Sequence, residues 1–270
     1  MLVTYIDHMG TDLSVVNAAK VSFGKASKWA YLDWRHSTMH PQRKMLSDRD
    51  TKLIQFLARG CTSNDWDSLK SDIMARAGYG TDEMEYLLNH IRRMPSHWSP
   101  FAHTAITLHL KMPLFVARQI MKHTTGIEYN EISRRYVDDE PQFYVPDVWR
   151  KRADNVKQGS SDEAVEDTFG VKFSSIGENT IHHEARRFNE SVLDLYKEML
   201  DHGVAPEQAR MILPQSMYTE VIMTGNLYAI ANLYNQRTDS HAQKETQDLA
   251  KQIGDIVEPL YPVSWKELTK

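Results

Sequence analysis

Residues 104–136 change from a strand pattern to a helix pattern and then to a dense polar cluster. In TAITLHLK, the apolar residues Ile106, Leu108 and Leu110 alternate with polar ones, which predicts a half-buried strand over 104–111. Pro113 suits the first position of the helix LFVARQIMKH that follows, whose apolar side chains supply a buried face. The polar run KHTTGIEYNEISRRY comes directly after it. We therefore expect a buried helix to deliver this polar loop into a protected place.

Further helices are predicted along the chain by apolar stripes and by start and stop signals. They cover the second half of 1–24 (after a strand or turn), 48–60, 81–94, 179–201, 225–237 and 240–257. Prolines bound the extended segment 142–146, which we expect to add a strand to the sheet, and the polar stretch 151–170 is predicted to be a mobile excursion. No linker or repeat divides the 270 residues, so we expect one domain, with surface insertions near 25–47 and 61–95.

The composition limits the partners that the chain can bind. Its 41% apolar and 25% charged residues are ordinary for a soluble globular protein. A net charge of −4 gives no general attraction to nucleic acid or to anionic membranes, so an anionic ligand needs a local cluster of cations. The N-terminus has no apolar core of signal-peptide length, and no apolar run is long enough to span a membrane. The expected location is the cytoplasm.

Neither a metal site nor a nucleophile is evident. Of the 12 histidines, only His182 and His183 are adjacent, and neighbouring side chains on a helix point about 100° apart, too far to share one ion. The single cysteine, Cys61, lacks neighbours that would lower its pKa, and we interpret it as a bystander. No dinucleotide-binding or phosphate-binding glycine loop is present. If the chain is an enzyme, its chemistry is therefore expected to come from a cofactor.

Anion binding is the remaining possibility that the residues themselves offer. The candidate cations are Arg118, Lys122, Arg134, Arg135, Arg210 and Arg237. Most such residues are solvated charges, but Arg210 and Arg237 lie among apolar neighbours in QARMIL and LYNQRTDSH. A buried guanidinium needs a partner, because burying it alone is very costly. A phosphate or carboxylate ligand, gripped in a bidentate manner, is the partner that we expect.

The run RQIMKHTTGIEYNEISRRY (118–136) resembles the signature of the flavin-dependent thymidylate synthases, which is Arg-His-Arg followed at a fixed spacing by a serine. Other segments resemble that family in the same order: 9–23, 97–119, 142–146, 209–219 and 226–243. The likeness thus spans most of the chain. It departs at Lys122-His123-Thr124, at a spacing one residue longer before Ser133, and at Tyr228, where arginine is common.

The resemblance implies an activity and a fold. Such enzymes convert dUMP to dTMP with a one-carbon unit from 5,10-methylenetetrahydrofolate and reducing equivalents passed from NADPH through FAD, without a cysteine nucleophile. They are homotetramers whose active sites draw on several subunits. The fold implied is α+β: a single domain with a central antiparallel sheet flanked by long helices.

The resemblance also implies roles for individual residues. The dUMP phosphate and sugar would be held by Gln119, Ser133, Arg135 and Arg210, with Lys122, Glu131 and Arg134 at the same ligand. FAD would contact Ser99, Lys122, His123, Thr124, Glu131, Asn226, Tyr228, Asn232 and His241. Arg237 would be catalytic: it would bind the uracil edge and stabilise negative charge as C5 becomes nucleophilic. His97 would lie on the folate or flavin side. Ser22 would be a further residue of the site, with no particular ligand assigned to it.

Two alternatives remain open at this point. One is a homologue that binds the nucleotide and flavin but has lost catalysis, because Lys122, Thr124 and the longer loop depart from the signature. It would bind dUMP and form no dTMP. The other is a cysteine-dependent thymidylate synthase, in which Cys61→Ala would abolish turnover.

Overall fold

The computed structural model describes residues 1–31, 44–59, 97–136, 139–153, 159–165 and 180–269. In the first half of the chain the elements are β1 (Leu2–Met9), α1 (Asp12–Lys20), η1 (Val21–Phe23), β2 (Ala30–Tyr31), β3 (Lys44–Met45), α2 (Asp48–Arg59), η2 (Ser99–Ala102), β4 (Ala105–Pro113), α5 (Leu114–Ile120) and β5 (Ile127–Glu131). The second half contains β6 (Arg150–Arg152), β7 (Ser160–Ala164), α6 (Ile181–Asp201), α7 (Pro206–Ala209), η3 (Arg210–Ile212), β8 (Tyr218–Gly225), α8 (Leu227–Thr238), α9 (Lys244–Val257) and α10 (Pro262–Leu268).

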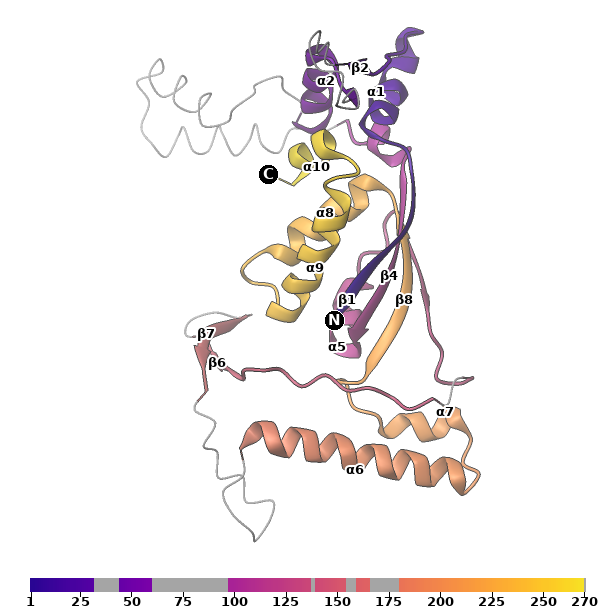
Figure 1. The fold of residues 1–270 in the computed structure, drawn as a ribbon, viewed down its shortest axis with the longest axis vertical. Coiled ribbons are helices and arrows are strands. Elements are labelled where there is room, and N and C mark those ends of the chain that lie inside the picture. The colour runs from indigo at the N-terminus through magenta and orange to yellow at the C-terminus, as the bar shows by residue number, and fades with distance from the viewer. Residues whose placement is uncertain (32–43, 60–96, 137–138, 154–158, 166–179, 270) are drawn as a thin grey trace, which may run out of the picture. The chain divides into compact units, whose positions relative to one another are not determined.

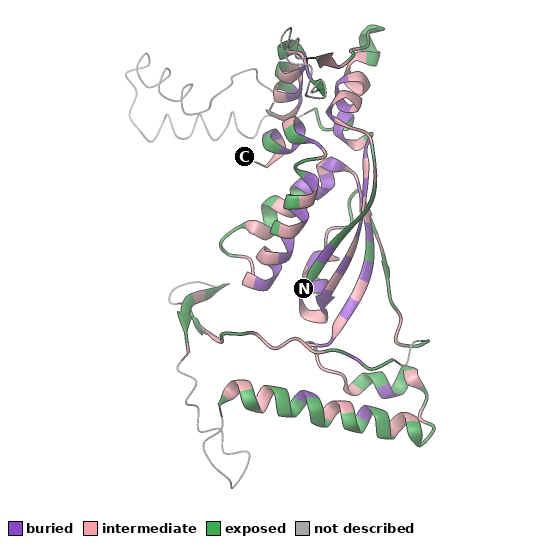
Figure 2. Cartoon of the chain, in the orientation of Figure 1, coloured by how far each residue is buried: buried purple, intermediate pink, exposed green. Residues whose placement is uncertain are grey.

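The main sheet has four strands in the order β1-β4-β8-β5 (Figure 1) and is antiparallel. The predicted strand 104–111 is confirmed as β4, where Ile106, Leu108 and Leu110 are fully buried and the residues between them are partly exposed (Figure 2). Strand β8 alternates in the same way, with Val221 and Met223 on its buried side. One face of these two strands therefore belongs to the core, and the mixed α and β fold class is confirmed.

The predicted helix after Pro113 is confirmed, but it is shorter than expected. Pro113 ends β4 and precedes α5, and α5 stops at Ile120. Lys122 and His123, the last two residues of the predicted helix LFVARQIMKH, therefore lie in a turn beyond it. The turn follows directly from a buried helix end, since Val116, Ala117 and Ile120 are buried.

The described chain divides into two compact units. The first contains residues 1–6, 107–224 and 233–253, and the second contains 7–106, 225–232 and 254–270. The chain passes from one to the other within β1, β4, β8, α8 and α9. The single-domain organisation stays a prediction.

The second unit contains a buried ionic network that joins α1 to the start of α2. Asp50, 3% exposed, forms an ion pair with Lys20 and accepts hydrogen bonds from Ser27 Oγ at 2.9 Å and Ser47 Oγ at 2.8 Å. Ser47 caps α2, because its hydroxyl accepts from the Asp50 N–H at 3.2 Å. Burial raises the pKa of the Asp50 carboxyl, but the hydrogen bonds from Lys20, Ser47 and Ser27 outweigh burial and lower that pKa overall.

A second buried carboxylate in this unit holds α10. Asp12 is 2% exposed and accepts hydrogen bonds from the backbone N–H groups of Val263 and Ser264, each at 2.9 Å. These groups belong to the first turn of α10, whose amides have no partner within the helix. Burial raises the pKa of Asp12, and the hydrogen bonds from Val263 and Ser264 offset only part of that effect. The carboxylate thus serves as the cap of a helix that the sequence analysis missed.

One prediction about the segment between residues 142 and 170 is wrong. Residues 142–146 form only an isolated bridge between Phe143 and Met217, not a strand of the main sheet, because Pro141 and Pro146 cannot donate to a ladder. The mobility of 151–170 stays a prediction, and its described residues belong to the antiparallel hairpin β6–β7, with Arg150 opposite Ala164. Arg150 fastens this hairpin to α9 through an ion pair of 2.7 Å with the buried Glu245.

The long helix predicted over 179–201 is confirmed as α6, which runs beside α7 (Figure 1). Thr180 caps it by accepting from the His183 N–H at 3.1 Å, and Gly203 follows its end with a φ of 80° that favours glycine. Its predicted apolar stripe is not buried: Phe188 is 57% exposed and Leu195 48% exposed, while only Asn189 and Tyr196 of the helix are buried (Figure 2).

Some predictions concern residues outside the described ranges. Cys61, the helix 81–94, the insertion 61–95 and part of the insertion 25–47 belong there. Among the described helices, none has the length and apolar character needed to cross a membrane. Within the same ranges, no three histidine, cysteine or acidic side chains gather as metal ligands would.

Candidate functional site

Arg237 joins two segments of the first unit that are far apart in sequence. It lies in the last turn of α8 and is half-buried. Its Nε donates to His123 Nε2 at 2.9 Å, and one terminal nitrogen donates to the Gln119 backbone carbonyl at 2.9 Å. The prediction that Arg237 needs a partner is thus met by protein groups. Its other terminal nitrogen, Nη1, has no hydrogen-bond partner in the described chain, so part of the guanidinium fork is available to a ligand.

Gln119 contributes its backbone to Arg237 and its side chain to α9. Its amide nitrogen donates to the Phe115 carbonyl at 3.3 Å and to Gln243 Oε1 at 2.6 Å. Its amide oxygen accepts from the hydroxyl of the fully buried Thr246 at 3.1 Å. The Gln119 side chain, expected from the resemblance to hold dUMP, is therefore committed to neighbours within the chain.

His123 is held as a neutral ring. Its Nε2 accepts from Arg237, and an imidazole that accepts at this atom carries its proton on Nδ1. Burial, and then the charge of Arg237, lower the pKa of His123 below its ordinary value of 6.5. The hydroxyl of Tyr129 donates to the carbonyls of His123 at 2.9 Å and Ile120 at 3.0 Å, which fixes the turn that carries the ring. Burial raises the pKa of Tyr129, so this hydroxyl stays a donor.

The lowered pKa of His123 predicts a pH-dependent stability. Below 6.5 the unfolded chain takes up a proton at this histidine, while the folded chain does not until its lower pKa is reached. The free energy of unfolding should therefore fall as the pH falls through this window. Urea unfolding at about pH 7.5 and about pH 5.5 measures the effect. His123→Gln keeps an acceptor without a proton to gain, so its loss of stability should be smaller than that of the parent. Equal losses would contradict the prediction.

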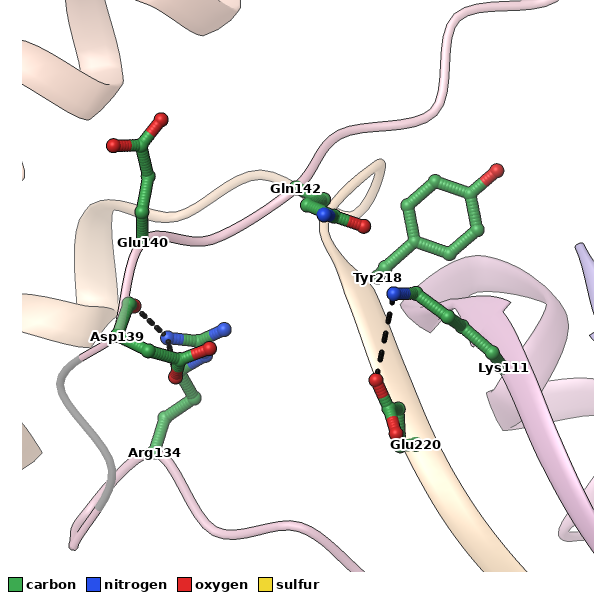
Figure 3. Close-up of a pocket in the computed structure, with 7 residues that line it drawn as sticks. All are labelled: Lys111, Arg134, Asp139, Glu140, Gln142, Tyr218 and Glu220. Atoms are coloured by element: carbon green, nitrogen blue, oxygen red, sulfur yellow. Dashed lines mark hydrogen bonds and ion pairs between the residues drawn. The ribbon is translucent and has the colours of Figure 1, made fainter.

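The residues at the end of β5 and just after it divide between two surroundings. Glu131 accepts from the hydroxyl of the buried Thr219 at 2.7 Å, and Ser133 accepts weakly from the Arg135 N–H at 3.4 Å. Arg134 instead points into a polar pocket, where it pairs with the Asp139 carboxylate at 3.0 Å and donates to the Asp139 carbonyl (Figure 3). The pocket is lined by Lys111, Arg134, Asp139, Glu140, Gln142, Tyr218 and Glu220.

The charges around this pocket compensate one another. Glu220 pairs with Lys111 at 3.5 Å (Figure 3) and with His109 at 2.9 Å, and Glu140 pairs with Lys197 at 3.0 Å. No excess of positive charge remains for a phosphate. Arg134, expected at dUMP, is used in this structure to brace the loop.

Two other arginines expected at the dUMP phosphate meet at α7. Arg135 pairs with the Glu207 carboxylate at 3.4 Å, and Arg210 donates to the Glu207 carbonyl at 3.4 Å. Both arginines are exposed, so the prediction that Arg210 is buried among apolar residues is wrong. The structure nevertheless brings together two guanidinium groups from segments far apart in sequence, which is a geometry suited to an anion.

The remaining candidates of the first unit lie on exposed turns. Lys122 and Thr124 flank His123 and have no hydrogen bond or ion pair with any residue in the described ranges. His241 follows α8, where its backbone N–H donates to Asp239 at 2.8 Å. The φ of Gly159 is 98°, and a side chain there would come within 3.9 Å of the His241 carbonyl, so β7 begins beside this turn.

The second unit carries the other candidates. The ring of Trp98 lies 5.9 Å from the ring of Tyr228, and His97 stacks on Phe56 at 5.4 Å. Asn226 caps α8, since its side-chain oxygen accepts from the Ala229 N–H at 2.9 Å. Three further candidates of this unit are exposed: Ser22, Ser99 and Asn232.

Arg237, His123 and Gln119 form a cluster, and some residues that support it were missed by the sequence analysis. Gln243 and Thr246 orient Gln119, and Tyr129 fixes the turn of His123. Glu207 likewise joins Arg135 to Arg210. A polar residue at the first turn of a helix is ordinary, so no signal in the sequence separates Gln243 and Thr246 from other surface positions.

Comparison with known proteins identifies the family. The profile of the family described as thymidylate synthase complementing protein matches residues 4–263. The chain is 31% identical over 269 residues to the flavin-dependent thymidylate synthase of Thermosipho africanus, covering 98% of this chain and 89% of that protein. It is also 31% identical over 261 residues to the protein of the same name from Kosmotoga olearia, covering 97% and 86%.

A solved structure agrees with these relatives. The UMP/dUMP methylase PolB from Streptomyces cacaoi, bound with 5-Br dUMP, superposes with a TM-score of 0.63 at 25% identity, covering 99% of this chain and 94% of that one. The chain belongs to the thymidylate synthase complementing protein family, and the resemblance to the flavin-dependent thymidylate synthases is confirmed.

Proposed function

We propose that this chain is a flavin-dependent thymidylate synthase that converts dUMP to dTMP in the cytoplasm. The one-carbon unit would come from 5,10-methylenetetrahydrofolate and the reducing equivalents from NADPH. The observation that carries the proposal is the guanidinium of Arg237, held between His123 and the Gln119 carbonyl, in a chain whose family match spans residues 4–263. Two segments of the family resemblance, 118–136 and 226–243, thus meet at one side chain.

Arg237 supplies a fixed positive charge in this proposal. Two of its nitrogens are held within the chain, and Nη1 would face the uracil edge at N3 and the adjacent carbonyl. A preorganised cation at that edge favours the enolate-like form of uracil, in which C5 is nucleophilic. Because arginine stays protonated, it stabilises this charge without giving up a proton. Arg135 and Arg210 would hold the dUMP phosphate, displacing their contacts with Glu207.

The residues around His123 fit an anionic flavin nucleotide. Lys122 is an exposed cation with no ion-pair partner among the described residues, Thr124 offers a hydroxyl, and the neutral His123 carries an N–H on Nδ1. In this unit, FAD would be held by these three together with Glu131 and His241. The resemblance to the family also assigns Ser99, Asn226, Tyr228 and Asn232 to FAD binding. When bound and reduced by NADPH, the flavin would supply the hydride that reduces the transferred one-carbon unit to a methyl group.

The substitution of lysine for the family's arginine at 122 predicts weakened flavin binding. Lysine offers a point charge where arginine offers a planar fork of donors. Lys122→Arg should therefore tighten FAD binding, by about tenfold if one charge-assisted hydrogen bond is gained. Fluorescence titration of FAD against the parent and the variant measures this. Identical dissociation constants would mean that other residues compensate for the lysine.

The homotetramer is supported by the apolar surface of α6. Phe188 and Leu195 are about half exposed on the same stripe of the helix. Large apolar side chains exposed in a row are typical of protein–protein interfaces. Sedimentation velocity of the purified chain tests this part of the proposal, and a monomer at micromolar concentration would contradict it.

The test of the function is NADPH oxidation that depends on dUMP. The purified chain, supplied with FAD and 5,10-methylenetetrahydrofolate, should oxidise NADPH at a rate that responds to dUMP. The catalytically impaired homologue would bind dUMP and FAD without forming dTMP. Cys61→Ala, at a position outside the described ranges, is expected to leave turnover unchanged, and loss of turnover would favour the cysteine-dependent alternative.

A further inference from the structure

The orientation of the Gln243 amide can be deduced from its neighbours. The Phe115 carbonyl can only accept, so the end of the Gln119 amide that faces it at 3.3 Å must be the NH₂ group. The Thr246 hydroxyl donates to the other end, the Gln119 oxygen. The same NH₂ group faces Gln243 at 2.6 Å, so Gln243 must present its oxygen there. These hydrogen bonds together leave the Gln243 NH₂ group pointing away from Gln119.

The Gln243 NH₂ group is a hydrogen-bond donor that the described part of the chain does not use. It has no hydrogen-bond partner among the residues that the structure describes, although Gln243 is half-buried. It lies in the segment that leads from Arg237 through His241 into α9, and its oxygen is bonded to the residue whose carbonyl holds Arg237. An amide NH₂ group can only donate, so the partner that would suit it is an acceptor such as a phosphate or carbonyl oxygen.

We propose that Gln243 is a further ligand-binding residue, whose NH₂ group donates to an acceptor oxygen of dUMP or FAD. This inference depends on the proposed function. Thr246 is its positioning residue: from a fully buried site, its hydroxyl fixes the polarity of the Gln119 amide and, through it, that of Gln243. The recognised chemistry is a phosphate or carbonyl oxygen, and separate titrations with the two ligands distinguish the sources.

Gln243→Glu is the sharpest test, because it separates the two ends of the side chain. A glutamate keeps an oxygen to accept from Gln119, but it replaces the free donor with a negatively charged acceptor. The dissociation constant of either dUMP or FAD should rise by about 10- to 100-fold. The matched control is Gln252→Glu, which adds the same charge to α9, where the side chain bonds only weakly to Asp248, at 3.4 Å. It should change both constants by less than about twofold.

The outcomes decide the proposal as follows. Loss of affinity for one ligand in Gln243→Glu alone supports it and identifies the ligand. Affinities for both ligands within about twofold of the parent would overturn it, because the bond to Gln119 is then the whole role of the residue. A parent chain that binds neither ligand would instead refute the proposed function.

A second pair of variants decides the matter if Gln243→Glu does not fold. Thr246→Val removes the hydroxyl and keeps the shape, so the Gln119 amide loses one of the bonds that fix it, whereas Thr246→Ser keeps the hydroxyl. Affinity for the same ligand should fall severalfold in Thr246→Val, with Thr246→Ser close to the parent. Equal affinities in the two variants would count against the proposal.

Discussion

Arg237→Ala should lower kcat by about 10²- to 10³-fold, the effect of removing one preorganised donor to a developing negative charge. The structure gives the reason. Two nitrogens of the guanidinium are anchored on His123 and on the Gln119 carbonyl, so the remainder is presented in a fixed direction. Steady-state kinetics with dUMP as the varied substrate measure the loss. Unchanged turnover would refute the catalytic role of Arg237.

Arg237→Lys is the informative companion to this variant. Lysine keeps the positive charge but cannot bond to His123, to the Gln119 carbonyl and to uracil from one planar group. We expect most of the loss in kcat to remain. A lysine variant with nearly full activity would mean that charge alone is sufficient and that the anchoring seen here has no part in catalysis.

Asp50→Ala should reduce the free energy of unfolding by about 3 kcal/mol, because it leaves a partly buried charge without its partner. Lys20, whose side chain is 18% exposed, would keep only the Ser27 hydroxyl, and the Ser47 hydroxyl that caps α2 would lose its acceptor on the Asp50 carboxylate. Urea unfolding followed by circular dichroism measures the change.

The double variant Lys20→Met/Asp50→Leu is the control for this prediction. Replacing both charges with apolar groups removes the unpaired ion, so the double variant should be more stable than Asp50→Ala. If the two have equal stability, the loss in Asp50→Ala comes from the cap and the packing, not from the uncompensated lysine.

The elements with strong periodicity could be predicted, and those without it could not. Strand β4 alternates regularly and was found from the sequence. Strand β8 was missed, because its buried side includes the polar Thr219 and its exposed side includes the apolar Ile222, which obscures the alternation. Helix α10 was missed because its cap, Asp12, lies far away in the sequence and only the fold brings the two together.

The candidate site, too, could be predicted from the sequence only in part. The resemblance to the family located Arg237, His123 and Gln119, but no spacing rule says that Arg237 bonds to the other two. Arg134 and Arg210 share their residue type with Arg237, yet one braces a loop and the other is exposed beside Glu207. Arg134 and Arg210 have partners close in sequence, whereas those of Arg237 are more than 100 residues away. The residue type alone does not predict which of these partners an arginine takes.

The formation of dTMP tests the central claim most directly. The purified chain and its Cys61→Ala variant are incubated with dUMP, 5,10-methylenetetrahydrofolate and NADPH, with and without FAD, and the nucleotides are separated and quantified. We predict that both proteins form dTMP and that both require the flavin. No dTMP in the presence of FAD, or dTMP that forms without flavin and disappears with the cysteine, would contradict the account.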